Sequence, residues 1–243
     1  MSATDRSSWV LVTGAASGIG RATAIAFAST GANLVLTDID ASRLEETCED
    51  VWALGRDCLA RPVDVSNAEA MDYFAEWVHG EMSVPALDVL VNNAGIGFLG
   101  PFFDTPLDAW QRIVQVNLLG VVNGCRSFLP VMLRAGGKRR IVNVASLAGV
   151  VAAPNMSAYV ATKHAVVGFG ESLGLELKLS GAQVGISTVY LRTIKTPLRD
   201  GPRNIACTID IARQQARGVL RDRNLELGDG GADPGAFRAH STG

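Results

Sequence analysis

The sequence predicts an α/β fold: a single domain built on a doubly wound parallel sheet of about six strands. Three observations support this. A glycine-rich turn, Gly14 to Gly20, separates an apolar run from an Ala-rich helical segment. Apolar runs alternate with helical periodicity along most of the chain, which favours parallel strands joined by right-handed crossovers. One almost wholly apolar run ends abruptly in Asn92-Asn93-Ala94-Gly95, as expected where a strand buried on both faces reaches the carboxyl edge of a sheet.

The first unit is an apolar strand, Trp9 to Val12, followed by the glycine turn and a helix over Arg21 to Ser29. Glycines allow a sharp turn and close approach of a ligand, and the N-terminus of the following helix favours a pyrophosphate. The spacing is G-x3-G-x-G, which differs from the usual G-x-G-x-x-G dinucleotide pattern. Taken alone, it is also compatible with an ordinary strand-to-helix turn.

A second strand, Asn33 to Asp38, ends in a carboxylate about 20 residues after the glycines. A carboxylate there can accept hydrogen bonds from the adenosine ribose and repel a 2′-phosphate, so Asp38 favours NAD over NADP. The alternative is that Asp38 caps the next helix, Ala41 to Leu54, a role that Asp40 could fill equally well.

Past a strand at Leu59 to Val63, Asp64 either bonds the adenine amino group or organises the turn. A helix (Ala68 to Glu81) and a strand (Leu87 to Val91) follow. The loop Gly97 to Pro106 carries Phe98, Leu99, Phe102 and Phe103, and forms either a buried crossover or an apolar pocket wall. Helical periodicity then extends from Leu107 to Ala135, and Asn117 in this stretch needs hydrogen-bond partners if it is buried.

The fifth strand, Arg140 to Ser146, ends in a hydroxyl, and a helix from Tyr159 to about Ser180 precedes a sixth strand, Gln183 to Tyr190. Tyr159 and Lys163 are four residues apart and share one helix face. A free phenol has a pKa of about 10, so an adjacent ammonium and the positive ring of an oxidised nicotinamide would be needed to favour the phenolate. This pattern predicts that Tyr159 exchanges a proton with the substrate, Ser146 bonds the substrate oxygen and Lys163 lowers the pKa of Tyr159.

These motifs resemble those of the short-chain dehydrogenase/reductase family, in its order and spacing, over roughly residues 9 to 190. They are Thr13-Gly14-x3-Gly18-Ile19-Gly20, Asp64-Val65, Asn92-Asn93-Ala94-Gly95, Asn117, Ser146 and Tyr159-x3-Lys163. The resemblance implies a Rossmann-like domain, a Ser-Tyr-Lys centre, and an Asn117 that holds a water beside Lys163. It also implies that the helices carrying Asn117 and Tyr159 often form a subunit interface, so we expect a homodimer; we doubt a tetramer, because the family uses its seventh strand in tetramer contacts and this sequence shows no such strand.

The resulting site prediction has two parts. The expected catalytic residues are Asn117, Ser146, Tyr159 and Lys163. The expected NAD-binding residues are Gly14, Ser17, Gly18, Ile19, Gly20, Asp38, Asp64, Val65, Asn92, Ala94, Gly95, Tyr159, Lys163, Ile194 and Thr196.

The chain departs from the family after the sixth strand. Leu191-Arg192 stands where Pro-Gly is expected, although Ile194 and Thr196 fit positions that contact the carboxamide. We expect residues 1–198 to form the NAD-binding and catalytic domain, and 199–243 to be an atypical tail, partly helical and then disordered, without the usual seventh strand. The principal interpretation is an NAD-dependent oxidoreductase for a secondary alcohol or ketone. The alternative is a dinucleotide-binding protein with little or no activity.

The composition of the chain limits the classes of partner that it is expected to bind. A net charge of −2 gives no electrostatic footprint for nucleic acid, and no uninterrupted apolar run is long enough to span a membrane, which favours a cytoplasmic protein. The four cysteines and three histidines are scattered, so we expect free thiols and no metal site. The expected partner is a small alcohol or ketone. Apolar residues between Ser146 and Tyr159 favour a hydrophobic one.

Overall fold

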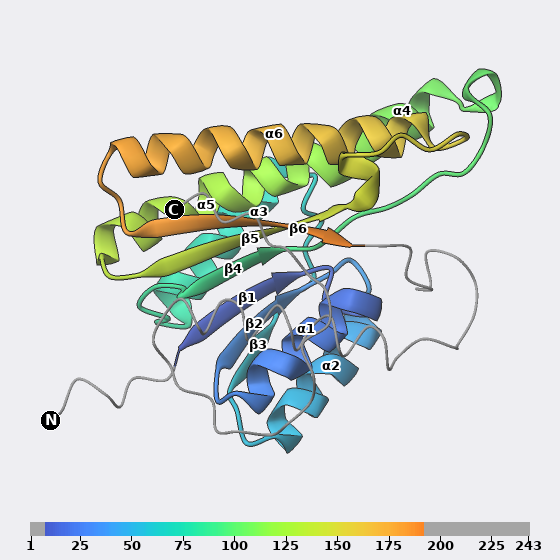
Figure 1. The fold of residues 1–243 in the computed structure, drawn as a ribbon. Coiled ribbons are helices and arrows are strands. Elements are labelled where there is room, and N and C mark those ends of the chain that lie inside the picture. The colour runs from blue at the N-terminus through green and yellow to red at the C-terminus, as the bar shows by residue number, and fades with distance from the viewer. Residues whose placement is uncertain (1–7, 192–243) are drawn as a thin grey trace, which may run out of the picture.

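The computed structural model describes residues 8–191, which form one parallel sheet with helices on both faces (Figure 1). The described strands are β1 Trp9–Thr13, β2 Asn33–Thr37, β3 Cys58–Ala60, β4 Val89–Asn92, β5 Arg139–Ser146 and β6 Val184–Leu191. The predicted doubly wound parallel sheet of six strands is confirmed. The predicted boundary at residue 198, the tail and the missing seventh strand lie outside the described residues.

The helices follow the predicted alternation. They are α1 Gly18–Ser29, α2 Ala41–Ala53, α3 Ala68–Glu76, α4 Leu107–Val114, α5 Gly120–Ala135 and α6 Ser157–Leu179. Short 3-10 turns occupy Phe102–Asp104 and Leu147–Gly149. The stretches predicted as the continuous helices Ala68 to Glu81 and Leu107 to Ala135 each contain a π-helical turn, at Trp77–Glu81 and Gln115–Leu119 respectively.

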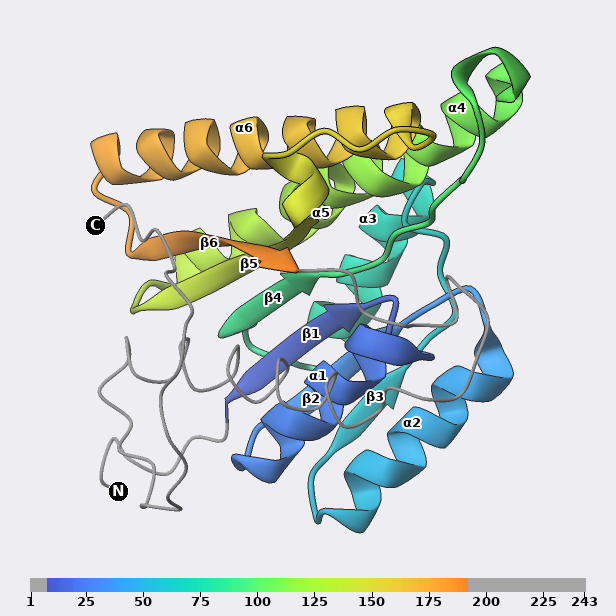
Figure 2. The same ribbon diagram turned by 45° about the vertical axis from the view of Figure 1, so that its right-hand side comes forward.

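The strand order is β3-β2-β1-β4-β5-β6, so the chain reverses its direction of travel across the sheet between β1 and β4 (Figure 2). Every described pairing is parallel, and the register pairs Val12 with Leu36 on one side of β1 and with Val91 on the other. In open α/β sheets, ligands bind outside the carboxyl ends of the strands at such a reversal. The fold therefore predicts a ligand site beyond the carboxyl ends of β1 and β4.

Two apolar cores lie on opposite faces of the sheet. On one face, Val10, Val12 and Leu36 pack with Phe27 of α1 and Leu44 of α2. On the other, the alternate positions Leu11, Val35 and Leu90 pack with Phe74 of α3 and Phe128 of α5. Because successive strand side chains point to opposite faces, strands covered on both sides read as continuous apolar runs.

The helical stretch Leu107–Ala135 is, by length and composition alone, apolar enough to cross a membrane, with a mean hydropathy of 1.4 in its best window. The expectation concerned uninterrupted apolar runs, and this stretch is not one, because polar residues such as Asn117 and Asn123 lie within it. Half of that window is buried inside the fold. Its buried residues Phe128 and Met132 belong to the core against the sheet, which accounts for the hydropathy of the helix.

The expectation of free cysteines is wrong for two of them. Cys48 of α2 and Cys58 of β3 form a disulfide, with their Cα atoms 5.6 Å apart, while Cys125 is free and buried. Neighbouring elements in the fold bring the two residues within the normal reach of a disulfide. The spacing of cysteines along the sequence carries no information about that proximity.

Candidate active site

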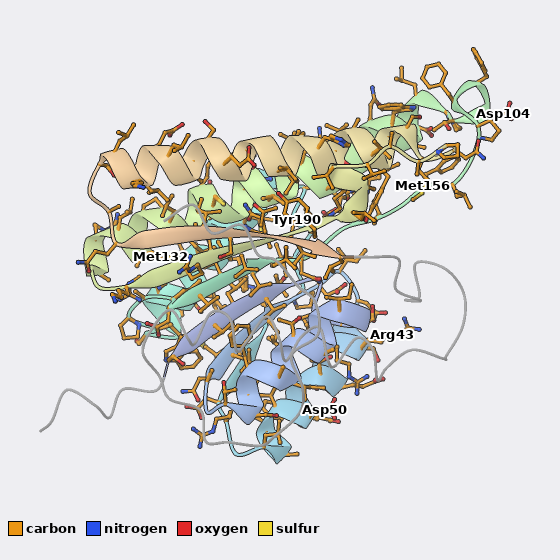
Figure 3. The ribbon with its side chains drawn as sticks, in the orientation of Figure 1. Arg43, Asp50, Asp104, Met132, Met156 and Tyr190 are labelled. Atoms are coloured by element: carbon orange, nitrogen blue, oxygen red, sulfur yellow. A yellow bond between two sulfur atoms is a disulfide. The ribbon has the colours of Figure 1, made fainter. Side chains whose placement is uncertain are left out.

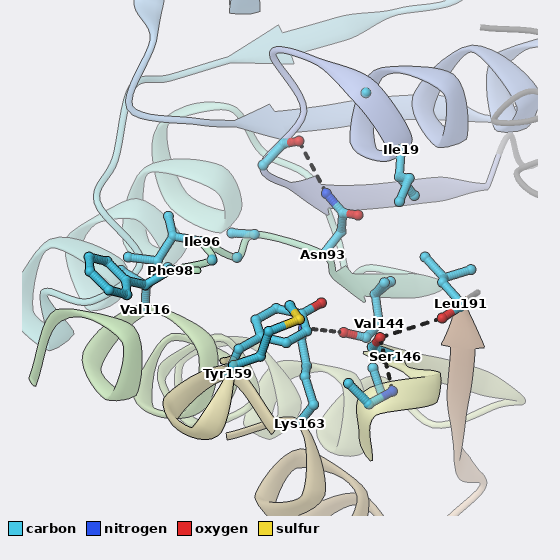
Figure 4. A pocket seen from close by; sticks show the side chains of 18 of the residues that line it. Ile19, Asn93, Ile96, Phe98, Val116, Val144, Ser146, Tyr159, Lys163 and Leu191 are labelled. Atoms are coloured by element: carbon cyan, nitrogen blue, oxygen red, sulfur yellow. Dashed lines mark hydrogen bonds between the residues drawn. The ribbon is translucent and has the colours of Figure 1, made fainter. Parts of the chain in front are cut away.

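A cavity of about 690 Å³ lies at the carboxyl edge of the sheet, beyond the ends of β1 and β4 (Figure 4). Twelve of the predicted site residues line it: Gly14, Ser17, Gly18, Ile19, Asp38, Asp64, Val65, Ala94, Gly95, Ser146, Tyr159 and Lys163. Gly20, Asn92 and Asn117 are not in its lining. Ile194 and Thr196 lie outside the described residues.

The glycine turn is shaped by backbone geometry and close packing. Gly14 and Gly18 have φ angles of 66° and 54°, in the left-handed region that favours glycine. A Cβ atom on Gly20 would overlap the carbonyl oxygen of Gly14, so Gly20 supports the turn from beneath without reaching the cavity. Gly20 was expected at the cofactor; the structure shows it packed closely against Gly14 and outside the cavity lining.

The start of α1 fits the pyrophosphate of a dinucleotide. The Ser17 side chain makes no capping hydrogen bond, and the first turn contains no acidic residue. The first N–H groups of a helix have no partner within the helix and carry partial positive charge. Since Ser17, Gly18 and Ile19 line the cavity, these groups are available to an anionic ligand there.

Asn93 holds the turn in place and was not among the predicted site residues. Its Nδ2 donates to the carbonyl oxygens of Thr13 (2.9 Å) and Gly14 (3.1 Å), and its backbone N–H donates to the Thr13 hydroxyl (3.0 Å) (Figure 4). The end of β4 is thereby tied to the end of β1. The doubled Asn at a strand end was the only available signal, and the sequence does not say which of the two faces the cavity.

Asn92, which was expected to border the cofactor, is not among the residues that line the cavity. It is buried, and its Nδ2 donates to Asn143 Oδ1 on β5 at 2.9 Å and to Cys125 Sγ at 3.5 Å. Asn92 and Asn143 are register partners on neighbouring strands. Because strand side chains alternate, only one Asn of the doublet can turn toward the cavity.

At the far end of the cavity, Asp38 is held by backbone amides. Its carboxylate accepts hydrogen bonds from the N–H groups of Ala16 (3.0 Å), Ile39 (2.7 Å) and Asp40 (3.1 Å). Asp40 caps α2, accepting from the Arg43 N–H at 3.2 Å. Of the two roles left open by the sequence, the capping role thus belongs to Asp40, and Asp38 lines the cavity.

Asp64 both organises its turn and lines the cavity. It accepts hydrogen bonds from the backbone and hydroxyl of Ser66 (2.9 and 2.6 Å) and from Arg112 at 3.0 Å. Burial acts to raise the pKa of Asp64, but the bonds from Ser66 and the Arg112 guanidinium outweigh it and leave that pKa lowered. Arg112, which also lines the cavity, was missed because nothing in the sequence shows that α4 passes beside Asp64.

Ser146, Tyr159 and Lys163 meet in the middle of the cavity lining (Figure 4). The Ser146 hydroxyl accepts from the Ala148 N–H at 3.2 Å and donates to the Leu191 carbonyl at 3.5 Å. Lys163 Nζ donates to the Val144 carbonyl at 2.8 Å and lies 5.7 Å from the centroid of the Tyr159 ring. All three residues therefore stand where β5, α6 and the end of β6 converge.

The pKa values of the pair differ from the sequence expectation. Burial raises the pKa of Tyr159, and its hydrogen bond with Ser146 only partly opposes this. Burial lowers the pKa of Lys163 to about 8. Lys163 does not lower the pKa of Tyr159 in the protein alone, because desolvation of both groups dominates.

Asn117 lies in the π-helical turn between α4 and α5 and is fully buried. Its Oδ1 accepts from the Ile96 N–H at 2.8 Å, and its Nδ2 donates to the Ile96 carbonyl (2.9 Å) and to the Thr162 hydroxyl (3.2 Å). The expectation that a buried Asn117 would have partners is confirmed. Through Thr162, Asn117 connects the loop after β4 to the helix that carries Lys163.

The other end of the cavity is apolar. The loop after β4 contributes Phe98 and Leu99, and the segment between Ser146 and Tyr159 contributes Leu147, Val151 and Met156. Of the two alternatives for the phenylalanine loop, the pocket wall therefore holds for Phe98 and Leu99. Phe102 and Phe103 are in neither place, because both side chains are exposed.

Comparison with known proteins identifies a family. Residues 8–204 match the family profile described as short chain dehydrogenase. The chain is 45% identical over 187 residues to a protein of Mycobacterium tuberculosis named "Probable oxidoreductase EphD"; the match covers 77% of this chain and 31% of that protein. The chain thus spans less than a third of the length of this relative.

Two solved structures resemble the fold. One is a short chain dehydrogenase/reductase from Burkholderia phymatum in complex with NAD, with a TM-score of 0.75 and 33% identity, covering 91% of this chain and 81% of that one. The other is an alcohol dehydrogenase from the archaeon Thermococcus sibiricus complexed with 5-hydroxy-NADP. Its TM-score is 0.80 at 25% identity, covering 89% of this chain and 91% of that one.

Proposed function

Since the chain belongs to the short chain dehydrogenase family, we propose that it is an NAD-dependent oxidoreductase that interconverts a secondary alcohol and a ketone. The observation that carries the proposal is the shared cavity. The glycine turn, the anchored carboxylate of Asp38 and the Ser146, Tyr159 and Lys163 side chains all line it. A nicotinamide dinucleotide, bound with its pyrophosphate at α1, would take up the hydrogen of the alcohol carbon together with both electrons of its C–H bond, as a hydride, or return it to the ketone carbon.

Each of the three central residues has a distinct task in this proposal. Tyr159 takes the proton from the substrate hydroxyl, or returns it to the ketone oxygen. Ser146 turns its hydroxyl from the long bond to Leu191 toward the substrate oxygen and so stabilises charge that develops there. Lys163, held by the Val144 carbonyl, supplies positive charge beside the Tyr159 ring.

Asn117 is a positioning residue in this scheme. Its three hydrogen bonds to Ile96 and Thr162 occupy both Nδ2 hydrogens and one Oδ1 lone pair. One lone pair remains for a water of the kind implied by the family resemblance. The Asn117 and Lys163 side chains both lie beside Gly95, which supports a proton path between them.

The preference for NAD rests on Asp38. Three backbone N–H groups fix its carboxylate at the end of the cavity that would take the adenosine ribose. A fixed negative charge there repels a 2′-phosphate. The two structural neighbours carry NAD and an NADP derivative respectively, so the family alone does not decide between the two dinucleotides.

Three further assignments belong to the same proposal. The substrate is a small and preferably hydrophobic molecule, supported by the apolar end of the cavity. The protein is a homodimer, supported by exposed leucines on the outer parts of α5 and α6, Leu133, Leu175 and Leu179. It works in the cytoplasm, an assignment that rests on composition.

The test is the Tyr159→Phe variant. Turnover of secondary alcohols should fall by about two to four orders of magnitude, because general acid–base catalysis contributes roughly that factor. Calorimetric affinity for NADH should stay within about twofold, and NADH should bind more tightly than NADPH to both proteins. Full activity in the variant would refute the mechanism, and tighter binding of NADPH would refute the cofactor preference.

A second candidate function has one specific observation in its favour. The Ser146 hydroxyl bonds the carbonyl of Leu191, a residue that stands where the family has Pro-Gly. If that bond persists with substrate present, the protein binds the dinucleotide but does not turn over. NADH binding without reaction across a broad panel of alcohols and ketones would favour this candidate.

A further inference from the structure

An exposed apolar surface adjoins the apolar end of the cavity, and the mechanism above does not use it. We call it the apolar rim. Its residues come from the loops after β4 and β5 and from the start of α4: Leu99, Phe102, Phe103, Leu107, Val150 and Val151. Phe103 is 94% exposed and Leu107 is 73% exposed. Large exposed apolar patches on soluble proteins usually mark interaction sites.

The rim is continuous with the cavity. Leu99 and Val151 belong to both, since each lines the cavity and is more than half exposed. The Gly100 N–H donates to the Asn155 carbonyl at 2.9 Å and so joins the two loops. In Figure 3 the labels of Met156 and Asp104 mark these loops at the same end of the molecule.

The aromatic side chains of the rim are in contact with one another and with α4. The Phe102 ring packs edge-on against Phe103, with centroids 5.4 Å apart, and against Trp110 of α4, with centroids 6.2 Å apart. The α4 helix begins at Leu107 and carries Trp110 at the end of its first turn. The exposed rings are therefore braced by a helix that also carries Arg112 at the cavity.

The charged residues of the cavity lining already have partners, and none of the described ones lies at the apolar end. The charged side chains among the described lining residues are Asp38, Asp64, Arg112 and Lys163. Asp64 and Arg112 pair with each other, Asp38 is satisfied by amides, and Lys163 is bound to Val144. Among the described residues that line the apolar end of the cavity, none carries a charge that would pair with a carboxylate, phosphate or amine of the substrate.

The volume of the cavity limits how much of an apolar substrate can lie inside it. Cavities of roughly 300–1,000 Å³ typically hold one drug-sized ligand. The cavity of about 690 Å³ has to take both the dinucleotide and the reacting part of the substrate. A substrate with a larger skeleton has to leave the cavity, and the surface it meets beyond Leu99 and Val151 is the rim.

We propose that the substrate is a secondary alcohol or ketone with an extended, uncharged apolar skeleton, whose distal part lies on the apolar rim. This rests on the proposed oxidoreductase function and names its substrate class. Contacts between the rim and the non-reacting part of the substrate would position its oxygen at Ser146 and Tyr159. Phe103, the most exposed ring of the rim, is a specificity-determining residue in this proposal.

The experiment measures how the affinity of the NADH-loaded protein for 2-alkanones depends on chain length from four to twelve carbons. Affinities are taken from calorimetry in the Tyr159→Phe background, where the ketone is not consumed, and turnover is taken from NADH absorbance with Tyr159 in place. Burial of each further methylene should lower Kd by about threefold to fourfold. Phe103→Ser should raise Kd of the twelve-carbon ketone by about fivefold and that of the four-carbon ketone by less than twofold.

The matched control is Tyr73→Ser, an exposed aromatic on α3 that does not line the cavity. It should leave both affinities within twofold of the parent. A Kd that does not depend on chain length, or an equal effect of the two variants on the twelve-carbon ketone, would overturn the proposal. So would a Phe103→Ser protein whose sedimentation mass changes while its ketone affinities do not, because the rim would then be a subunit contact.

Failure of the two proposals is distinguishable. If no ketone oxidises NADH but the affinities follow the expected pattern, the oxidoreductase function fails and the rim is still a ligand surface. If ketones of all lengths are reduced at equal kcat/KM and bind with equal Kd, the function holds and the assignment of the rim is wrong.

Discussion

Burial of Lys163 disfavours its charged ammonium form. The ammonium is nearly inaccessible to water, its hydrogen-bond acceptor is the neutral Val144 carbonyl, and desolvation lowers its pKa to about 8. The neighbouring Tyr159 has its pKa raised for the same reason. A bound oxidised nicotinamide, which brings a positive ring, would favour the phenolate. The protein alone therefore holds Tyr159 in its protonated form, and we expect the cofactor to be part of what activates it.

The lowered pKa of Lys163 makes the free energy of unfolding depend on pH. Its folded pKa of about 8 lies below the ordinary value of 10.5. Between these two pH values the unfolded chain holds a proton that the folded chain has released, so the free energy of unfolding rises with pH across this window. Below about pH 8 both states are protonated and this contribution is constant.

Urea unfolding of the parent and of Lys163→Met at pH 7, 8, 9 and 10 measures this contribution, because titrating groups that do not contact Lys163 cancel in the difference. The parent should gain stability relative to the variant as pH rises from 8 to 10. A difference that does not change with pH would show that Lys163 titrates normally in the folded protein.

At the level of elements, close packing of α5 on the sheet depends on one glycine. A Cβ atom on Gly124 would overlap Asn92 Oδ1, and Asn92 is in turn bonded to Asn143 of β5 and Cys125 of α5. The helix can approach β4 closely only because this position lacks a side chain. Just before α5, the π-helical turn at Gln115–Leu119 contains Asn117, and such turns are frequent at functional sites.

Gly124→Ala should therefore destabilise the protein by about 1–3 kcal/mol, the usual cost of overpacking. Gly168→Ala on α6 is the matched control, because a Cβ atom there meets nothing within 4 Å. That change should be neutral or stabilise the protein by up to about 1 kcal/mol, the helix-propensity difference between the two residues. Equal denaturation midpoints for the two variants in urea, followed by circular dichroism, would refute this account.

Across the whole molecule, the polar and the apolar ends of the cavity lie at different positions along the carboxyl edge of the sheet. Loops after β1, β2 and β3 provide the polar end of the cavity, with Asp38 and Asp64, and the loops after β4 and β5 provide its apolar end. The Cys48–Cys58 disulfide lies on the polar side, where it joins α2 to the outermost strand on that side, β3. Cytosolic reductants normally keep such cysteines as thiols, so a cytoplasmic protein would have to fold without this bond.

Reduction should lower the free energy of unfolding of the whole domain by about 2–3 kcal/mol, the loop-entropy value for a closed loop of this size. Thermal or urea unfolding with and without dithiothreitol measures the loss. Cys48→Ala, which cannot form the bond, should show no response to dithiothreitol. If the parent is equally insensitive to the reductant, the disulfide does not form in solution.

The sequence by itself determined the layered fold and the order of its elements, and it predicted that Ser146, Tyr159, Lys163 and the glycine turn belong to one site, where the structure places them in the lining of one cavity. These follow from local rules, since apolar runs, helical periodicity and four-residue spacing are properties of neighbouring residues. Only the tertiary structure decided which Asn of the doublet faces the cavity, that Arg112 reaches Asp64, and that Cys48 meets Cys58. It also revealed the raised pKa of Tyr159. Each of these depends on contacts between residues distant in the chain or on burial, and no local pattern encodes either.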